Sequence, residues 1–144
     1  MDKNLWLVFG LLSAFFASLV SIFGKIGLRN VDANTATAIR SVIMAVFIII
    51  VVAFQGKLTD IPSVLSDKKA TLFIVLSGLA GAMSWLCYFF AIKSGDVSKV
   101  VPIDKLSVVF AVVLAITFLG EKISLTALIG IASIAVGAVL VAVG

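Results

Sequence analysis

Three charged residues lie within or beside long apolar runs, where charge is a candidate for chemistry. Arg40 precedes an uncharged run that continues to Phe54, and the pair Asp104-Lys105 precedes another that ends before Glu121. Ionisable groups embedded in apolar surroundings are costly and tend to face a ligand, a partner or water. We predict that these residues set the electrostatics of a solute-binding cavity, with Asp104 in binding or in proton coupling. The structural alternatives are that Arg40 reaches a polar surface with its long stem and that Asp104 pairs with a base to begin a helix.

Trp85 and Tyr88 form a second candidate group. Their three-residue spacing places them on one helix face, which continues the small residues Ser77 and Gly81. Aromatic side chains with polar tips form a belt at the membrane interface, or they line a cavity in which stacking and hydrogen bonds hold an amphiphilic solute. Because Trp85 lies inside the apolar run 70–92 rather than at its end, the cavity is favoured.

The residue inventory excludes several function classes. The chain has no histidine and one cysteine, Cys87, so it lacks Ser/His/Asp and Cys/His nucleophile systems, His/Cys zinc sites and a disulfide framework. We therefore predict that it is not an enzyme and that it uses no metal or other cofactor. The net charge is +4, but the basic residues are scattered between apolar runs, which argues against a nucleic-acid partner.

Composition identifies the solvent that the chain meets. Its 144 residues are 62% hydrophobic and 12% charged, against about 45–50% and 25% for a soluble domain. Such a chain has too little polar surface to face water, so it must face the lipid bilayer.

Charged residues divide the chain into five apolar runs near the roughly 20 residues that cross a membrane as a helix. We predict an all-α membrane protein with one transmembrane domain over residues 1–144 and spans at about 4–24, 34–54, 70–92, 100–120 and 123–143. Asp32 and Asn34 are the expected helix-start residues of the second span, and Ser124 is expected to cap the fifth helix. A short interfacial helix is expected within residues 55–69.

The fourth span is short once its charges are removed. The 15 residues between Lys105 and Glu121 reach about 22 Å as a helix, less than the roughly 30 Å of hydrocarbon. The helix is therefore expected to begin near Val100, with Pro102 in its first turn and Asp104 at the positive end of its dipole. The second span is similarly short, and short or interrupted spans are typical of a transporter's binding site.

Basic residues divide almost evenly between the two sides of the predicted membrane. The side of the N-terminus has five and the other side has six: Lys3, Lys57, Lys68, Lys69 and Lys122, against Lys25, Arg29, Arg40, Lys93, Lys99 and Lys105. The positive-inside rule therefore predicts no single orientation. The balance indicates either weakly determined insertion or insertion both ways, with antiparallel pairing.

Small residues recur at three- and four-residue steps in three spans, which predicts close helix packing and a subunit contact along the last span. These helix-packing candidates are Ser13, Ala17, Ser77, Gly81, Gly130, Ser133 and Gly137.

Several local motifs carry a family likeness. They are Ala38–Arg40, Gly81–Trp85, Ala91–Asp96 (AIKSGD), Val101–Ser107 (VPIDKLS) and Phe118–Lys122 (FLGEK), followed by a glycine-rich final helix. Over its whole length the chain resembles the EamA-like domain of the drug/metabolite transporter superfamily, in its single-domain, five-helix bacterial and archaeal branch. The FLGE turn and the proline before the fourth helix are moderately specific together.

The resemblance implies a ten-helix transport unit of two inverted five-helix repeats, of which this chain supplies one half. An antiparallel homodimer in the cell (cytoplasmic) membrane is therefore expected. Family members mostly export small organic solutes, such as amino acids and other metabolites, through a central cavity by alternating access. The substrate-binding candidates are Arg40, Trp85, Tyr88, Asp104, Lys105 and Ser107.

Two alternatives remain open. The chain is also similar to small multidrug-resistance exporters, which exchange protons for lipophilic cations. These are four-helix chains with an acidic residue in the first helix. The first span here has none, so coupling would have to use Asp104. A non-transport membrane subunit that binds a partner protein through its small-residue stripes is the other alternative.

Overall fold

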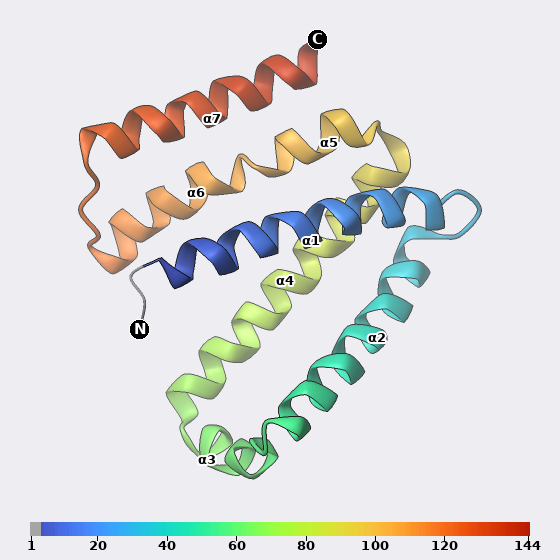
Figure 1. Ribbon diagram of the computed structural model, residues 1–144, viewed down its shortest axis with the longest axis vertical. Coiled ribbons are helices and arrows are strands. Elements are labelled where there is room, and N and C mark those ends of the chain that lie inside the picture. Colours follow the sequence, from blue (N-terminus) through green and yellow to red (C-terminus); the bar gives the residue numbers. More distant parts are fainter. Residues whose placement is uncertain (1–3) are drawn as a thin grey trace. The chain divides into compact units, whose positions relative to one another are not determined.

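The computed structural model describes residues 4–144, which are mostly helical (Figure 1). Lys3, counted in the charge balance, lies outside the described residues. Within residues 4–144, five segments are long and apolar enough to cross a membrane, which confirms the predicted all-α membrane protein. Four of them are single helices: α1 (Leu5–Gly27), α2 (Ala33–Phe54), α4 (Lys68–Ser94) and α7 (Leu125–Val143). The remaining span, Val97–Leu119, is the fourth along the chain and is composite. It consists of α5 (Val97–Asp104), α6 (Ser107–Leu114) and the π-helix η2 (Ala115–Leu119). The short helices η1 (Leu58–Asp60) and α3 (Ile61–Ser66) join α2 to α4.

The apolar side chains of the spans lie mostly on the outside of the single chain. Phe9, Phe47 and Phe110 are each more than three-fifths exposed. Exposing apolar surface to water costs about 25 cal/mol per Å², whereas contact with lipid or with another helix removes that cost. The outer surface is therefore suited to a bilayer.

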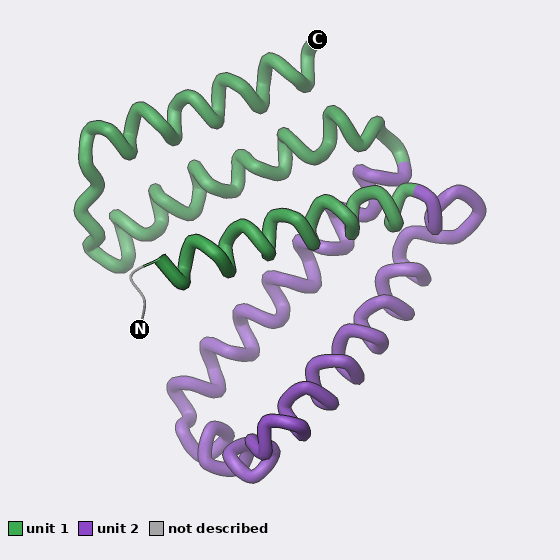
Figure 2. Tube along the Cα trace, in the orientation of Figure 1, with its two compact units in different colours: residues 1–25, 94–144 green, residues 26–93 purple. Residues whose placement is uncertain are grey.

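The chain divides into two compact units, coloured separately in Figure 2. Unit 1 comprises residues 1–25 and 94–144, and unit 2 comprises residues 26–93. Within unit 1, α7 packs against α5 and α6. The Lys25 ammonium, near the end of α1, donates a hydrogen bond to the Gly95 carbonyl at 2.9 Å. This contact ties the end of α1 to the loop that precedes α5.

In unit 2 the start of α2 is held to the end of α4. The Asp32 carboxylate accepts hydrogen bonds from the Thr35 backbone N–H at 2.9 Å and from the Thr35 hydroxyl at 3.0 Å, which confirms Asp32 as the N-cap. The Lys93 ammonium donates to the Val31 carbonyl at 2.9 Å. The buried side chains of this unit lie on these two segments and in the turn before α2: Ala33, Thr37, Phe89 and Ile92, with Leu28 in the turn. This end of unit 2 is therefore its best-packed region.

The fourth span begins earlier than predicted and is broken. Its first piece, α5, starts at Val97 and contains Pro102 in its interior, so the prediction of Pro102 in the first turn is wrong. Proline has no N–H for the carbonyl four residues earlier, which weakens the helix around it. The piece ends at Asp104, so this carboxylate lies at the negative end of the α5 dipole rather than the predicted positive end. A turn at 105–106 separates α5 from α6.

The remainder of this span is also irregular. η2 continues from α6 and ends at Leu119, and the next residue, Gly120, has a left-handed φ of 66° that favours glycine. Single-turn π-helices are rare in proteins, and those that occur often lie at functional sites. The Ser124 side chain then accepts a hydrogen bond from the Ala127 backbone N–H at 3.1 Å, which confirms Ser124 as the cap of α7.

Candidate functional site

Arg40 stacks on two aromatic rings of α4. Its guanidinium carbon lies 3.8 Å from the centroid of the Trp85 ring and 4.4 Å from that of Phe89. Trp85 and Phe89 stack on each other, with centroids 5.6 Å apart and an angle of 26° between the rings. A guanidinium over an aromatic face is attracted by the ring quadrupole, more strongly where water is excluded. The contact therefore holds a cation inside a membrane-spanning helix.

The polar edge of Arg40 is incompletely satisfied. Its Nε is buried and has no hydrogen-bond partner within the described part of the chain. Arginine remains charged and carries five N–H donors in a planar fork. Stacking uses the faces of that plane and leaves the N–H groups at its edge. The guanidinium therefore keeps a donor that the described part of the chain does not use.

The structure brings three sequence-derived candidates together in unit 2. Tyr88 packs edge-on against Trp85, with centroids 5.7 Å apart, and against Phe89 at 5.8 Å. Arg40, Trp85 and Tyr88 thus belong to one cluster. Phe89, which is only 3% exposed, was missed from the sequence. Its four-residue spacing from Trp85 is the signal that would have identified it.

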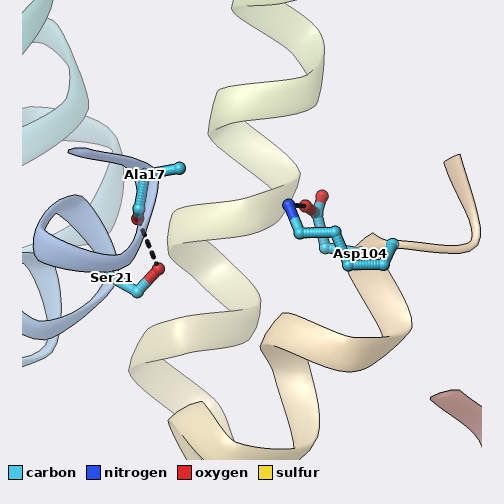
Figure 3. Close-up of polar contacts among 4 residues, drawn as sticks. Ala17, Ser21 and Asp104 are labelled. Carbon is cyan, nitrogen blue, oxygen red and sulfur yellow. Dashed lines mark hydrogen bonds and ion pairs between the residues drawn. The ribbon is translucent and has the colours of Figure 1, made fainter. Parts of the chain in front are cut away.

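Asp104, Lys105 and Ser107 lie at the break in the fourth span, within unit 1. The Lys105 ammonium donates to the Asp104 carboxylate at 3.2 Å, with these side chains 51% and 36% exposed respectively. Ser107 is the first residue of α6 and is exposed. Figure 3 shows Asp104 with this ion pair and, on α1, the Ser21 hydroxyl that donates to the Ala17 carbonyl at 3.0 Å. Such an exposed pair adds little stability, and its role in solute binding stays a prediction.

The small-residue stripes face open space within each unit. A Cβ added to Gly81, Gly130 or Gly137 would meet no atom within 4 Å. Ser13, Ala17, Ser77 and Ser133 are likewise exposed. Their packing role stays a prediction that requires a neighbour other than the described chain. Across the described residues, no three His, Cys, Asp or Glu side chains are grouped so that they could hold a metal ion.

Comparisons with known proteins agree on the class of protein. The model of the EamA-like transporter family matches residues 4–143. An uncharacterized transporter in the cobO 3' region of a Sinorhizobium species is 43% identical over 141 residues, covering 96% of each chain. The uncharacterized protein MJ1333.1 of Methanocaldococcus jannaschii is 25% identical over 137 residues, covering 95% of this chain and 96% of the relative. No solved structure gave a significant match. The chain therefore belongs to the EamA-like transporter family and is a multi-pass membrane transporter rather than an enzyme.

Proposed function

We propose that this protein is a secondary transporter that exports small organic metabolites, such as amino-acid-like solutes, across the cytoplasmic membrane. The observation that carries the proposal is the Arg40 guanidinium, which stacks on Trp85 and Phe89 within the spans and has a buried Nε without a hydrogen-bond partner. A charge within a membrane span is costly, and such charges are typical of binding and transport sites. Family membership supports transport as that purpose.

The residues of unit 2 have distinct roles in this proposal. Arg40 attracts a polar group of the solute, while Trp85 and Tyr88 contact its apolar part. Because Phe89 is buried beneath the guanidinium, it supports Arg40 rather than contacting solute. The cluster then discriminates solutes by both charge and apolar surface.

Separately, the break in the fourth span supports a conformational role. The turn at 105–106 and the π-helix η2 leave only α6 as regular helix between them. Irregular helical segments are places where two pieces of a span change angle, as alternating access requires. We assign Asp104 and Lys105 to the charge of this segment and Ser107 to a hydrogen bond with the solute.

A homodimer completes the proposed transport unit. One chain has five candidate spans, and the stripe formed by Gly130, Ser133 and Gly137 is exposed on α7. Small residues allow transmembrane helices to approach closely. The balanced basic residues support antiparallel pairing. These features favour two opposed copies that enclose one pathway.

Flux in proteoliposomes tests the transport function. The purified protein is reconstituted and loaded with radiolabelled amino acids, organic acids, sugars or organic cations, with protein-free liposomes as the control. We expect one solute class to leave faster than from the control under an imposed gradient. Correctly folded protein that gives no protein-dependent flux for any class would contradict the proposal.

Tag accessibility tests the dimer's orientation. Tags at each terminus are probed from both sides of the membrane in intact and permeabilised cells. We expect each terminus on both sides. A single orientation for every molecule would contradict antiparallel pairing of identical chains.

Proton-coupled export of lipophilic cations is the second candidate, and it depends on Asp104 at the broken span. Asp104→Asn should then abolish the pH dependence of flux, while Asp60→Asn in η1 serves as the matched control. Unchanged flux and pH dependence in Asp104→Asn would exclude proton coupling at this residue.

A further inference from the structure

We infer that unit 2 holds a binding site for the carboxylate of an anionic, partly apolar solute, with Arg40 as its recognition residue. This inference deepens the proposed function by naming the substrate class, and it rests on that function for its purpose. The juxtaposition that carries it is a guanidinium held over two rings of α4 with an unpartnered Nε.

The two rings occupy apolar contacts of the guanidinium and leave its hydrogen-bond donors to a ligand. A separation of 3.8 Å between the guanidinium carbon and the Trp85 centroid is van der Waals contact, so the Trp85 ring covers part of the guanidinium. The Phe89 ring, whose centroid lies 4.4 Å from the guanidinium carbon, makes a second apolar contact with it. Neither ring accepts the hydrogen bonds of the N–H edge. A carboxylate is the acceptor whose two oxygens match that edge, in a bidentate pair.

Charge balance within unit 2 supports the same ligand. Its acidic residues lie in the loops and at helix termini, and two are engaged there. The Asp32 carboxylate accepts from Thr35, and the Asp67 carboxylate accepts from the backbone N–H groups of Lys69 and Ala70 at 3.0 Å. No carboxylate in the part of unit 2 that the structure describes forms an ion pair with Arg40. The embedded cation therefore receives its counter-charge from a ligand.

The aromatic surroundings restrict the rest of the solute. Trp85 and Tyr88 are half-buried, and their rings meet edge to face at 88°. They present apolar ring surface beside the cation. This combination suits a monoanion with an apolar or aromatic body better than a small inorganic anion. It repels an organic cation, because a like charge would approach Arg40 without a carboxylate between them.

Tryptophan fluorescence can test the site directly. The chain has two tryptophans, and Trp6 is 73% exposed on α1, so Trp6→Phe leaves Trp85 as the single reporter. The Trp6→Phe variant in detergent micelles is titrated with 3-phenylpropanoate, 3-phenylpropylamine and 3-phenylpropanol, which share a 3-phenylpropyl group and differ in the charge of their polar group. We expect a saturable change in Trp85 emission with the acid and at least tenfold weaker binding of the amine and the alcohol.

Substitutions then assign the effect to Arg40. In the Trp6→Phe background, Arg40→Gln should weaken acid binding at least tenfold, the size expected for a lost charge-assisted pair. The affinity of Arg40→Lys for the acid should lie between that of the Trp6→Phe protein and that of Arg40→Gln, because lysine keeps the charge and loses the planar fork. Arg29→Gln removes an equal charge from a loop of the same unit and should leave the affinity unchanged. Far-UV circular dichroism verifies that each variant retains its helices.

The possible results separate this inference from the transport proposal. Equal binding of acid and amine, unchanged affinity in Arg40→Gln, or tighter binding of inorganic phosphate than of the acid would overturn the site. If Arg40→Gln does not fold, the three ligands and Arg40→Lys still decide. Arg40-dependent acid binding without flux of any solute would support the site and contradict transport. Flux of neutral or cationic solutes at an unchanged rate in Arg40→Gln would support transport and overturn the site.

Discussion

A double-mutant cycle between Arg40 and Trp85 measures how much free energy their stacking contact contributes to stability. The perturbations are Arg40→Met, which keeps an apolar stem, Trp85→Leu, and both together. The cycle isolates the pairwise term, because contacts that each side chain makes elsewhere cancel. Stability is followed by helix loss during titration with sodium dodecyl sulfate in mixed micelles.

The magnitude follows from the geometry. A cation–π contact contributes about 0.5–1 kcal/mol when exposed and about 2 kcal/mol when desolvated, and Arg40 is half-buried, with its guanidinium carbon 3.8 Å from the ring centroid. We expect a coupling of about 1 kcal/mol. Trp85→Leu also loses its contacts with Tyr88 and Phe89, each of about 0.5–1.5 kcal/mol. Its total cost should be about 2–4 kcal/mol in the native background and about 1 kcal/mol less beside Arg40→Met.

The sign of the arginine substitution is a second result of the same cycle. A charge costs up to about 2.5–3.5 kcal/mol at the centre of a membrane helix, more than the coupling that is lost, so Arg40→Met should stabilise the protein. Phe73→Leu is the control, because Phe73 is exposed on α4, about 18 Å before Trp85 along the helix axis. A coupling below about 0.3 kcal/mol for Arg40 and Trp85, no larger than that for Arg40 and Phe73, would refute the reasoning.

Three further predictions concern helix ends and the outer surface. The hydrogen bond from the Thr35 backbone N–H, followed by that from its hydroxyl, lowers the pKa of Asp32. Its stabilisation is therefore complete above the usual aspartate value of about 3.9 and is lost as pH falls through the lowered pKa. Asp32→Asn, which can still cap, should flatten the pH dependence of unfolding between pH 6 and pH 2, and an unchanged slope would contradict this. Ser124→Ala should lower the free energy of unfolding by about 1 kcal/mol in the detergent titration, because the Ala127 N–H loses its acceptor; no change would show that the cap contributes nothing. Gly137→Leu should leave the helicity of the single chain unchanged, since a Cβ there meets no atom within 4 Å, but should shift the detergent-solubilised protein from dimer to monomer in size-exclusion chromatography with light scattering. Ala132→Leu on the same helix should not, and equal behaviour of the two variants would contradict a contact through this stripe.

The local sequence was sufficient for the membrane-spanning architecture. Apolar runs without charge can satisfy their backbone groups in lipid only as helices, so the five spans follow from the positions of the charged residues. Asp32 and Ser124 were also predictable, because a carboxylate or hydroxyl before an apolar run caps the N–H groups of the next turn. Pro102 was placed wrongly because the start of its helix was set near Val100 by the length needed to span the membrane, whereas Asp96, a residue type that favours the N-cap position, lets α5 begin at Val97.

The candidate residues were identifiable in the sequence by their cost, since a charge or a polar aromatic side chain rarely lies within a membrane span without a purpose. Arg40 and Trp85 are 45 positions apart, and no spacing rule connects two helices across such an interval. The packing of α2 and α4 within unit 2 decided that the guanidinium stacks on Trp85, and it added the buried Phe89 to the contact. Sequence therefore determined which residues are too costly to be incidental. Tertiary structure decided which of them meet, because contact between helices depends on the facing side chains of both.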